Sequence, residues 1–101
     1  MLKNTLEEWD EVAVVEEVDE SDTGSVAHLI VYNDDHNTFD WVIECFMDVL
    51  EHSSVQSEQL ALIIHFKGKA TVKSGSKKSL MPKKDALIER GLSAVIEEED
   101  V

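Results

Sequence analysis

The stretch AHLIVYNDDHNTF, residues 27–39, decides how this chain folds. Its first six residues are mostly apolar or β-branched, which is typical of a strand. Residues 33–35 end that strand, because the short side chains of Asn and Asp hydrogen-bond to nearby backbone and favour turns. Asn37 or Thr38 can then cap a helix that begins near Phe39. The stretch therefore predicts a strand, a polar turn and a helix in immediate succession.

Two amphipathic helices are predicted after this turn. The first covers residues 39–51, where apolar side chains recur along one helix face, at Phe39, Val42, Ile43, Phe46, Val49 and Leu50. Ser53 and Gln56 have the spacing of a capping box, so a second helix begins there and should end near Gly68. We expect this second helix to turn an apolar side inward, formed by Leu60, Ile63 and Ile64.

The rest of the chain predicts two more strands on either side of a third helix. Residues 69–73 alternate weakly, as a strand does, and residues 92–96 form a last apolar strand. Between them, Pro82 suits the first turn of a helix and Gly91 suits its C-terminal end. This order of elements predicts an α+β fold, a small sandwich of a three-stranded, mainly antiparallel sheet with helices packed on one face.

A length of 101 residues is typical of one domain, but the charge is distributed unevenly along it. Residues 1–25 are acid-rich without a sustained period, which predicts a flexible N-terminal tail before a folded domain of residues 26–101. All basic residues of that domain lie between Lys67 and Arg90. The net charge of -13 argues against nucleic acid and anionic membranes as partners, whereas the basic region can serve as a protein docking surface.

The single cysteine, Cys45, lies within the apolar pattern of the first helix, so the sequence offers no disulfide framework. The first residues lack the apolar core of a secretion signal, and no apolar run is long enough to cross a bilayer. We therefore expect a cytoplasmic protein, and we expect it to be a monomer.

The acidic and His residues of the turn do not have the spacing of a metal site or of a catalytic centre. Asp34, Asp35 and His36 are adjacent and cannot all point at one tetrahedral ion, and no paired His or Cys spacing accompanies them. His65 lacks a nucleophile to activate, because no Ser lies in an elbow motif and Cys45 is in mid-helix. The sequence predicts no metal, no cofactor and no enzyme activity.

His65 closes the apolar run of residues 60–64, and its helix should pack near the strand that leads to Asn33. Carboxylate, amide and imidazole acceptors beside an apolar cluster suit a ligand that is cationic at one end and apolar at the other. The alternative for residues 33–35 is an ordinary turn and helix cap. The sequence therefore favours a binding module over a catalyst.

Three segments of the chain resemble the ClpS adaptors of bacteria: VYNDD at 31–35, WVIE at 41–44 and IHFKGKA at 64–70. Their order and spacing match that family over residues 27–97. The resemblance implies an adaptor for proteins that begin with a free, bulky hydrophobic residue, namely Leu, Phe, Tyr or Trp. It also implies delivery of these proteins to an AAA+ unfoldase, ClpA or ClpC, for degradation by ClpP.

The resemblance also implies roles for individual residues. Asn33, Asp34 and His65 match the positions that hold the α-amino group of the substrate, and Asp35 matches the second acid of the motif. The positions around the side-chain pocket are Val31, Asn37, Thr38, Phe39, Val42, Ala61 and Leu92.

The chain departs from the family pattern at the pocket. Ala61 stands where the family commonly has a methionine that guards the pocket, and residues 37–39 stand where it often has Thr-Pro-Met. The missing methionine predicts room for larger or branched first residues.

The implied contact with the unfoldase depends on the third helix. The segment between Lys73 and Leu92 is shorter than is usual in the family, and Lys83 and Lys84 are the implied contacts with the N-terminal domain of the unfoldase. The alternative is a ClpS-like interaction domain that serves a different partner through the basic region from Lys67 to Arg90.

Overall fold

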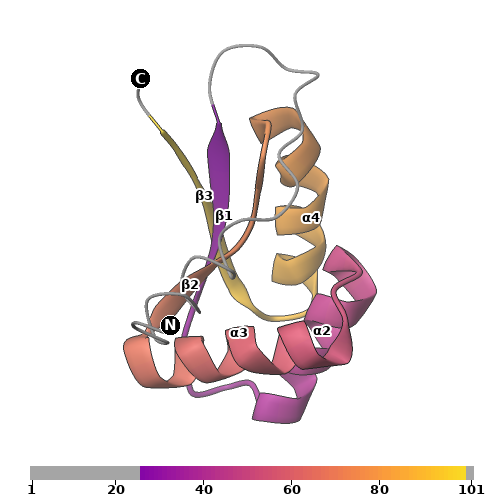
Figure 1. Cartoon of the computed structure of the whole chain (residues 1–101), viewed down its shortest axis with the longest axis vertical. Coiled ribbons are helices and arrows are strands. Elements are labelled where there is room, and N and C mark those ends of the chain that lie inside the picture. Colours follow the sequence, from indigo (N-terminus) through magenta and orange to yellow (C-terminus); the bar gives the residue numbers. More distant parts are fainter. Residues whose placement is uncertain (1–25, 100–101) are drawn as a thin grey trace, which may run out of the picture.

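The computed structural model describes residues 26–99. Its elements follow the predicted order of strand, helix, helix, strand, helix and strand (Figure 1). Their bounds are β1 (Ala27–Tyr32), α2 (Phe39–Leu50), α3 (Ser54–Lys67), β2 (Lys69–Gly75), α4 (Lys77–Glu89) and β3 (Ser93–Glu98). The predicted N-terminal tail, residues 1–25, lies outside the described residues.

The sheet has the order β2-β1-β3, and its central strand pairs antiparallel with both neighbours. Tyr32, the last residue of β1, pairs with Lys69 on one side and Ser93 on the other. The register against β2 shifts between Leu29 and Ile30, which bends the strand pair locally. The most apolar strand therefore lies in the middle of the sheet, and the predicted α+β class is confirmed.

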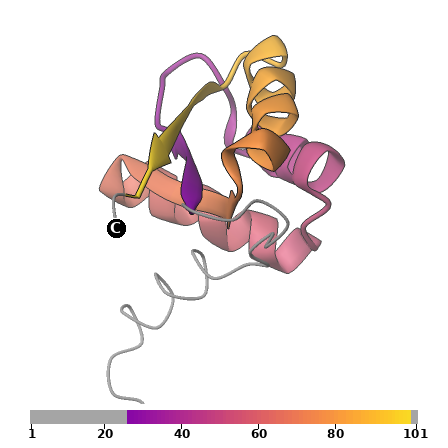
Figure 2. The same ribbon diagram turned by 90° about the horizontal axis from the view of Figure 1, so that it is seen from above.

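The core lies between one face of the sheet and the three helices (Figure 2). Alternate residues of β1 point into it, as the pleat of a strand requires, and Leu29 is fully buried. Each helix contributes side chains that are nearly inaccessible to solvent, among them Phe46, Leu60, Leu80 and Leu87. The helices α2 and α3 lie across the end of the sheet where β1 ends and β2 begins (Figure 1). This arrangement places the polar turn after β1 beside both helices.

Side-chain caps fix where the helices begin. Thr38 caps α2, because its Oγ1 accepts from the backbone N–H of Trp41 at 3.1 Å. Ser53 caps α3 and accepts from the N–H of Gln56 at 3.1 Å, as the capping-box spacing predicts. Gly68, in the left-handed region with φ 95°, ends α3 as predicted.

The predicted start of the third helix is wrong. The helix α4 begins at Lys77, so Pro82 lies in its interior rather than in its first turn. Ser76 caps the helix by accepting from the N–H of Ser79 at 3.1 Å, and Leu80 is fully buried in the core. This cap and this packing hold the turn before Pro82 in helical form, although proline lacks one helix hydrogen bond. Its C-terminal end agrees with the prediction, since Gly91 follows with φ 94°.

Candidate functional site

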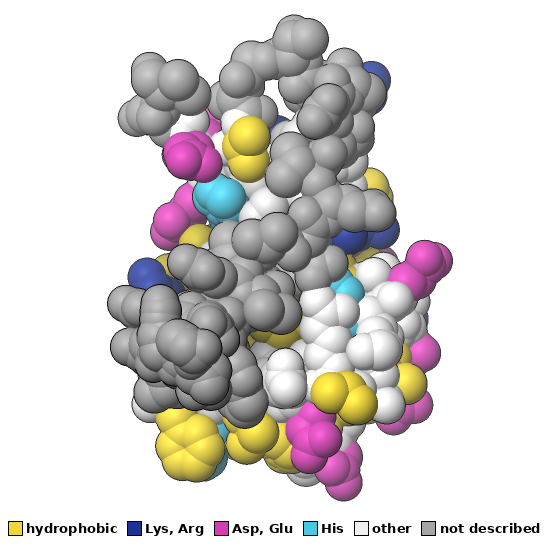
Figure 3. Space-filling model, viewed as in Figure 1, with side chains coloured by type: hydrophobic (Ala, Val, Ile, Leu, Met, Phe, Trp, Pro, Cys, Tyr) yellow, Lys and Arg dark blue, Asp and Glu magenta, His cyan; other side chains and the backbone are white. Residues whose placement is uncertain are grey.

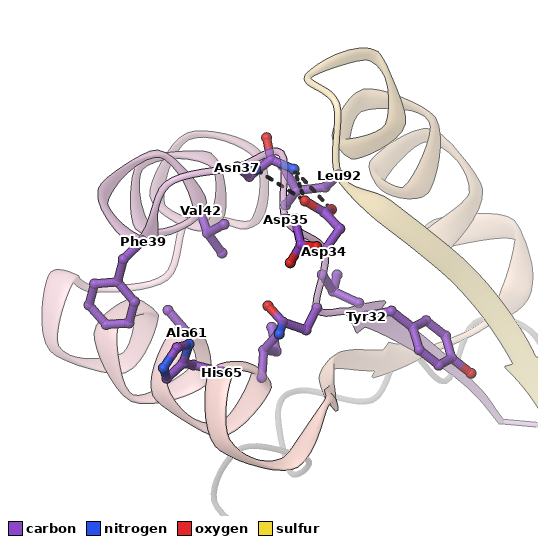
Figure 4. A pocket seen from close by; sticks show the side chains of 12 residues that line it. Tyr32, Asp34, Asp35, Asn37, Phe39, Val42, Ala61, His65 and Leu92 are labelled. Atoms are coloured by element: carbon purple, nitrogen blue, oxygen red, sulfur yellow. Dashed lines mark hydrogen bonds between the residues drawn. The ribbon is translucent and has the colours of Figure 1, made fainter.

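The residues around the polar turn enclose a cavity of about 280 Å³. It lies between the end of β1, the start of α2, the inner side of α3 and the residue that precedes β3 (Figure 4). The residues that line it are Val31, Tyr32, Asn33, Asp34, Asp35, Asn37, Phe39, Val42, Ala61, Ile64, His65 and Leu92. The fold therefore brings together three segments that are far apart in the sequence.

One side of the cavity is apolar. Val31 in β1, Ala61 in α3 and Leu92 just before β3 are almost inaccessible to solvent. Phe39 is more exposed, and Figure 4 shows it on the opposite side of the opening from Tyr32. An apolar group that enters this cavity would lose contact with water on several sides.

The other side is polar, and both carboxylate oxygens of Asp34 accept hydrogen bonds within it. Its Oδ1 accepts from the backbone N–H groups of His36 at 2.9 Å and Asn37 at 3.1 Å. The side-chain amide of Asn37 donates to both carboxylate oxygens at 3.0 Å and also to the backbone carbonyl of Gly91 at 2.9 Å. Asp34 thus holds the turn in shape.

Asp35, by contrast, offers its carboxylate to the cavity. Within residues 26–99 it makes no hydrogen bond or ion pair with another protein group, and it is exposed. Asn33 is also exposed, and its backbone is fixed because its N–H donates to the carbonyl of Gly68 at 2.9 Å. Among the residues of α3 that line the cavity, His65 has the polar side chain, and its ring packs edge-on against Phe66 with centroids 4.9 Å apart.

The end of the molecule formed by α2 and α3 carries hydrophobic and acidic side chains next to one another (Figure 3). Phe66 is 76% exposed, although it is a large aromatic residue. Acidic residues in this region come from the turn and from the first turns of α2, namely Asp34, Asp35, Asp40 and Glu44. The surroundings of the cavity therefore favour a positively charged ligand group.

Sequence comparison agrees with this geometry. The family model described as the ATP-dependent Clp protease adaptor protein ClpS matches residues 22–94. The chain belongs to the ClpS family. No individual curated protein sequence matches the chain.

The fold of this ClpS-family chain is similar to that of a solved structure, Agrobacterium tumefaciens ClpS2 bound to L-phenylalaninamide. The two structures agree with a TM-score of 0.69 and 21% sequence identity, over 74% of this chain and 98% of that chain. ClpS is a family of adaptors rather than of catalysts, so an adaptor role follows from membership.

The cavity brings together most of the predicted site residues of this ClpS-family chain. Asn33, Asp34, Asp35 and His65 lie at one cavity with the predicted apolar positions. Thr38 is the exception: it caps α2 and does not line the cavity, so its place among the pocket residues is corrected. Sequence reasoning missed Tyr32 and Ile64, although each is next to a predicted site residue.

Lys83 and Lys84 lie on α4 and do not line the cavity. Both are half-buried, and the Nζ of Lys84 lies 3.6 Å from a carboxylate oxygen of Asp85. They therefore belong to a different surface from the cavity, and their predicted contact with an unfoldase stays a prediction.

The described residues do not assemble a metal or nucleophile site. Within residues 26–99, no three side chains of His, Cys, Asp or Glu are grouped to hold a metal ion. Burial raises the pKa of the Cys45 thiol to about 11, and the nearby carboxylates of Asp48 and Glu44 add to this while Arg90 opposes it. The thiol is therefore protonated at neutral pH and is a poor nucleophile. In the same part of the chain, no helix is long and apolar enough to span a membrane.

Proposed function

We propose that this ClpS-family protein binds the free N-terminus of proteins that begin with a bulky hydrophobic residue and delivers them to an AAA+ unfoldase. The observation that carries the proposal is the two-sided cavity, with acceptors from Asn33, Asp35 and His65 beside buried apolar walls. The unfoldase would be of the ClpA or ClpC type and would pass the substrate to ClpP. Delivery rests on family membership.

The polar side of the cavity suits an α-amino group. Such a group has a pKa of about 7.7 to 8.0, so it is mostly protonated at neutral pH and has three N–H donors. An amide oxygen from Asn33, a carboxylate from Asp35 and a neutral imidazole nitrogen from His65 can each accept one of them. The N-terminus of α2 nearby favours anions, so the carboxylates are needed to attract a cation there.

The apolar side suits the side chain of the same residue. Burying a Phe or Leu side chain contributes roughly 1.5 to 3 kcal/mol, and each hydrogen bond to a charged group contributes roughly 1.5 to 3 kcal/mol. Association and ordering cost roughly 4 to 15 kcal/mol, so neither half of the site is sufficient alone. The ligand named with the Agrobacterium protein, L-phenylalaninamide, carries both a free α-amino group and an aromatic side chain.

Asp34 and Asp35 have different roles in this proposal. Asp34 accepts hydrogen bonds from the backbone of the turn and from Asn37, so its carboxylate supports the shape of the site. Its charge still contributes to the local potential that attracts the amine. Asp35 has no partner among the described residues and can bind the amine directly. The resemblance implies this contact for Asp34 and gives Asp35 only the place of a second acid.

The proposal is tested by titrating the full chain with fluorescent peptides that differ only in their first residue. We expect saturable binding of peptides that begin with Leu, Phe, Tyr or Trp, and no measurable binding of a peptide that begins with Asp. Equal affinity for the Phe and Asp peptides would contradict the proposal. Absence of binding to all of them would favour an interaction domain that acts through its basic region from Lys67 to Arg90.

The small side chain of Ala61 leads to a separate prediction about which first residues of a peptide the pocket accepts. Because its small side chain lies in the cavity wall at 3% exposure, the wider pocket should accept peptides that begin with Ile or Val. Ala61→Met should then weaken binding of Ile- and Val-initiated peptides by about 5-fold or more, since overpacking a filled site costs about 1 to 3 kcal/mol.

The matched control for this variant is Leu62→Met on the same helix, because Leu62 is half-buried but does not line the cavity. Its peptide affinities should stay within about two-fold of wild type, as expected for a swap that conserves volume. Rejection of Ile and Val by the wild-type protein would mean that another side chain, such as Phe39, fills the space beside Ala61.

A further inference from the structure

Two side chains at the start of α2 hold the turn between α4 and β3. The indole Nε1–H of Trp41 donates to the backbone carbonyl of Arg90 at 3.0 Å. The amide of Asn37 donates to the next carbonyl, that of Gly91, at 2.9 Å. These bonds join residues that are 49 and 54 positions apart in the chain. Two consecutive carbonyls of the turn are therefore tied to one helix end.

This turn leads directly to a wall of the cavity. Leu92 follows Gly91, is only 4% exposed, and lines the cavity opposite the residues of α3. Gly91 has φ 94°, a conformation that glycine adopts without strain and other residues rarely adopt. The backbone N–H of Leu92 donates to the carbonyl of Leu87 at 3.0 Å, which fixes the turn to α4. The bonds from Trp41 and Asn37 hold the carbonyl groups of the same turn toward the start of α2.

Asn37 and Trp41 differ in what else they contact. The amide of Asn37 also binds Asp34, so a change there would disturb the polar side of the cavity as well. Trp41 is 39% exposed and does not line the cavity. Its indole N–H donates to the turn that carries Leu92 and not to a residue that lines the cavity.

We infer that Trp41 is a positioning residue for the side-chain pocket: its indole N–H holds the turn that sets the place of Leu92. This inference rests on the proposed function of the cavity. In it, Trp41 affects recognition of the side chain of the first peptide residue. Asn33, Asp35 and His65 bind the α-amino group of that residue. A loss of the indole N–H should therefore loosen one wall of the pocket without changing the amine site.

The test is Trp41→Phe in the full chain, which keeps an aromatic ring and removes the donor. We expect the affinity for a Phe-initiated peptide to fall by about three- to ten-fold, the range expected for the loss of one hydrogen bond. A peptide of the same sequence that begins with Ala has only a methyl side chain, which we expect not to reach Leu92. Its weak affinity, measured by NMR titration, should change by less than about two-fold.

Met47→Ala is the matched control, because Met47 lies on the same helix with 40% exposure and does not line the cavity. Both peptides should bind this variant as they bind wild type. An equal loss for the Phe and Ala peptides in Trp41→Phe, or no loss for either, would overturn the inference. Failure of the wild-type protein to bind the Phe peptide would instead overturn the proposed function.

A second measurement needs no variant at position 41. The indole N–H resonance of Trp41 is distinguished from that of Trp9 by the spectrum of a Trp9→Phe protein. We expect this resonance to shift on saturation with the Phe-initiated peptide and to stay in place with the Ala-initiated peptide. An unchanged resonance with both peptides would contradict a positioning role, whether or not Trp41→Phe folds well.

Discussion

Asp35→Asn should weaken the binding of a Phe-initiated peptide by about 10- to 100-fold, because a hydrogen bond to a charged group contributes about 1.5 to 3 kcal/mol. The side chain keeps its size, and it loses the charge that attracts the protonated amine. Within the described residues its carboxylate has no protein partner, so folding stability should change little. Calorimetric titration gives the affinity, and thermal unfolding gives the stability.

Asp34→Asn is the informative comparison for this variant. An Asn amide at that position would direct N–H donors at the amide N–H donors of Asn37, which now donate to both oxygens of Asp34. We expect a loss of about 1 to 3 kcal/mol in unfolding free energy, because one of the two acceptor oxygens in this part-buried network is replaced by a donor. Binding should weaken as well, because the turn that carries Asp35 loses its support.

Peptide acetylation isolates the contribution of the amine. An N-acetylated Phe peptide should bind wild type and Asp35→Asn equally weakly, since neither can then form the charged contact. If Asp35→Asn bound the free peptide as tightly as wild type, Asp35 would have no part in amine recognition, and Asn33 and His65 would remain as the acceptors.

Phe46→Ala should lower the free energy of unfolding by about 3 to 5 kcal/mol. Phe46 of α2 is completely buried in the core, so its removal loses transfer free energy and leaves a cavity. That is a large part of the roughly 5 to 15 kcal/mol that stabilises a typical domain. Chemical denaturation followed by circular dichroism measures the loss.

The adjacent residue provides the control for this stability prediction. Met47 lies on the same helix and is 40% exposed, so Met47→Ala should change the unfolding free energy by about 0.5 kcal/mol or less. Similar losses in the two variants would contradict the assignment of this stabilisation to the buried face of α2. Because Phe46 does not line the cavity, the folded fraction of Phe46→Ala should still bind peptide.

The residue that caps α2 could not be decided from the sequence alone. The sequence allowed either Asn37 or Thr38 to cap α2, since both residue types serve as caps. In the structure Thr38 is the cap, since its Oγ1 accepts from the N–H of Trp41, whereas the amide N–H groups of Asn37 donate to Asp34 and to the carbonyl of Gly91. The side chain of Asn37 thus makes a contact that is distant in the sequence, and Thr38 makes the local one.

The start of α4 is also decided by contacts in the folded structure rather than by local preference. Pro82 is favourable in a first turn by local rules, but Ser76 caps the helix six residues earlier and the buried Leu80 holds the intervening turn. Packing against the sheet offsets the hydrogen bond that proline cannot make. The preference of proline for the first turn of a helix is therefore overridden by the packing of α4 in the core.

The sequence by itself determined the order of the elements, the α+β class and the neighbourhood of the site, because apolar periodicity and turn chemistry act over a few residues. Only the tertiary structure decided which carboxylate is free, and which side chains hold the pocket wall. The resemblance implies the amine contact for Asp34 and the place of a second acid for Asp35. In the structure the amide of Asn37 binds Asp34, whereas Asp35 has no partner among the described residues. The bond from Trp41 to Arg90 spans 49 residues, and only folding brings such groups within hydrogen-bonding distance.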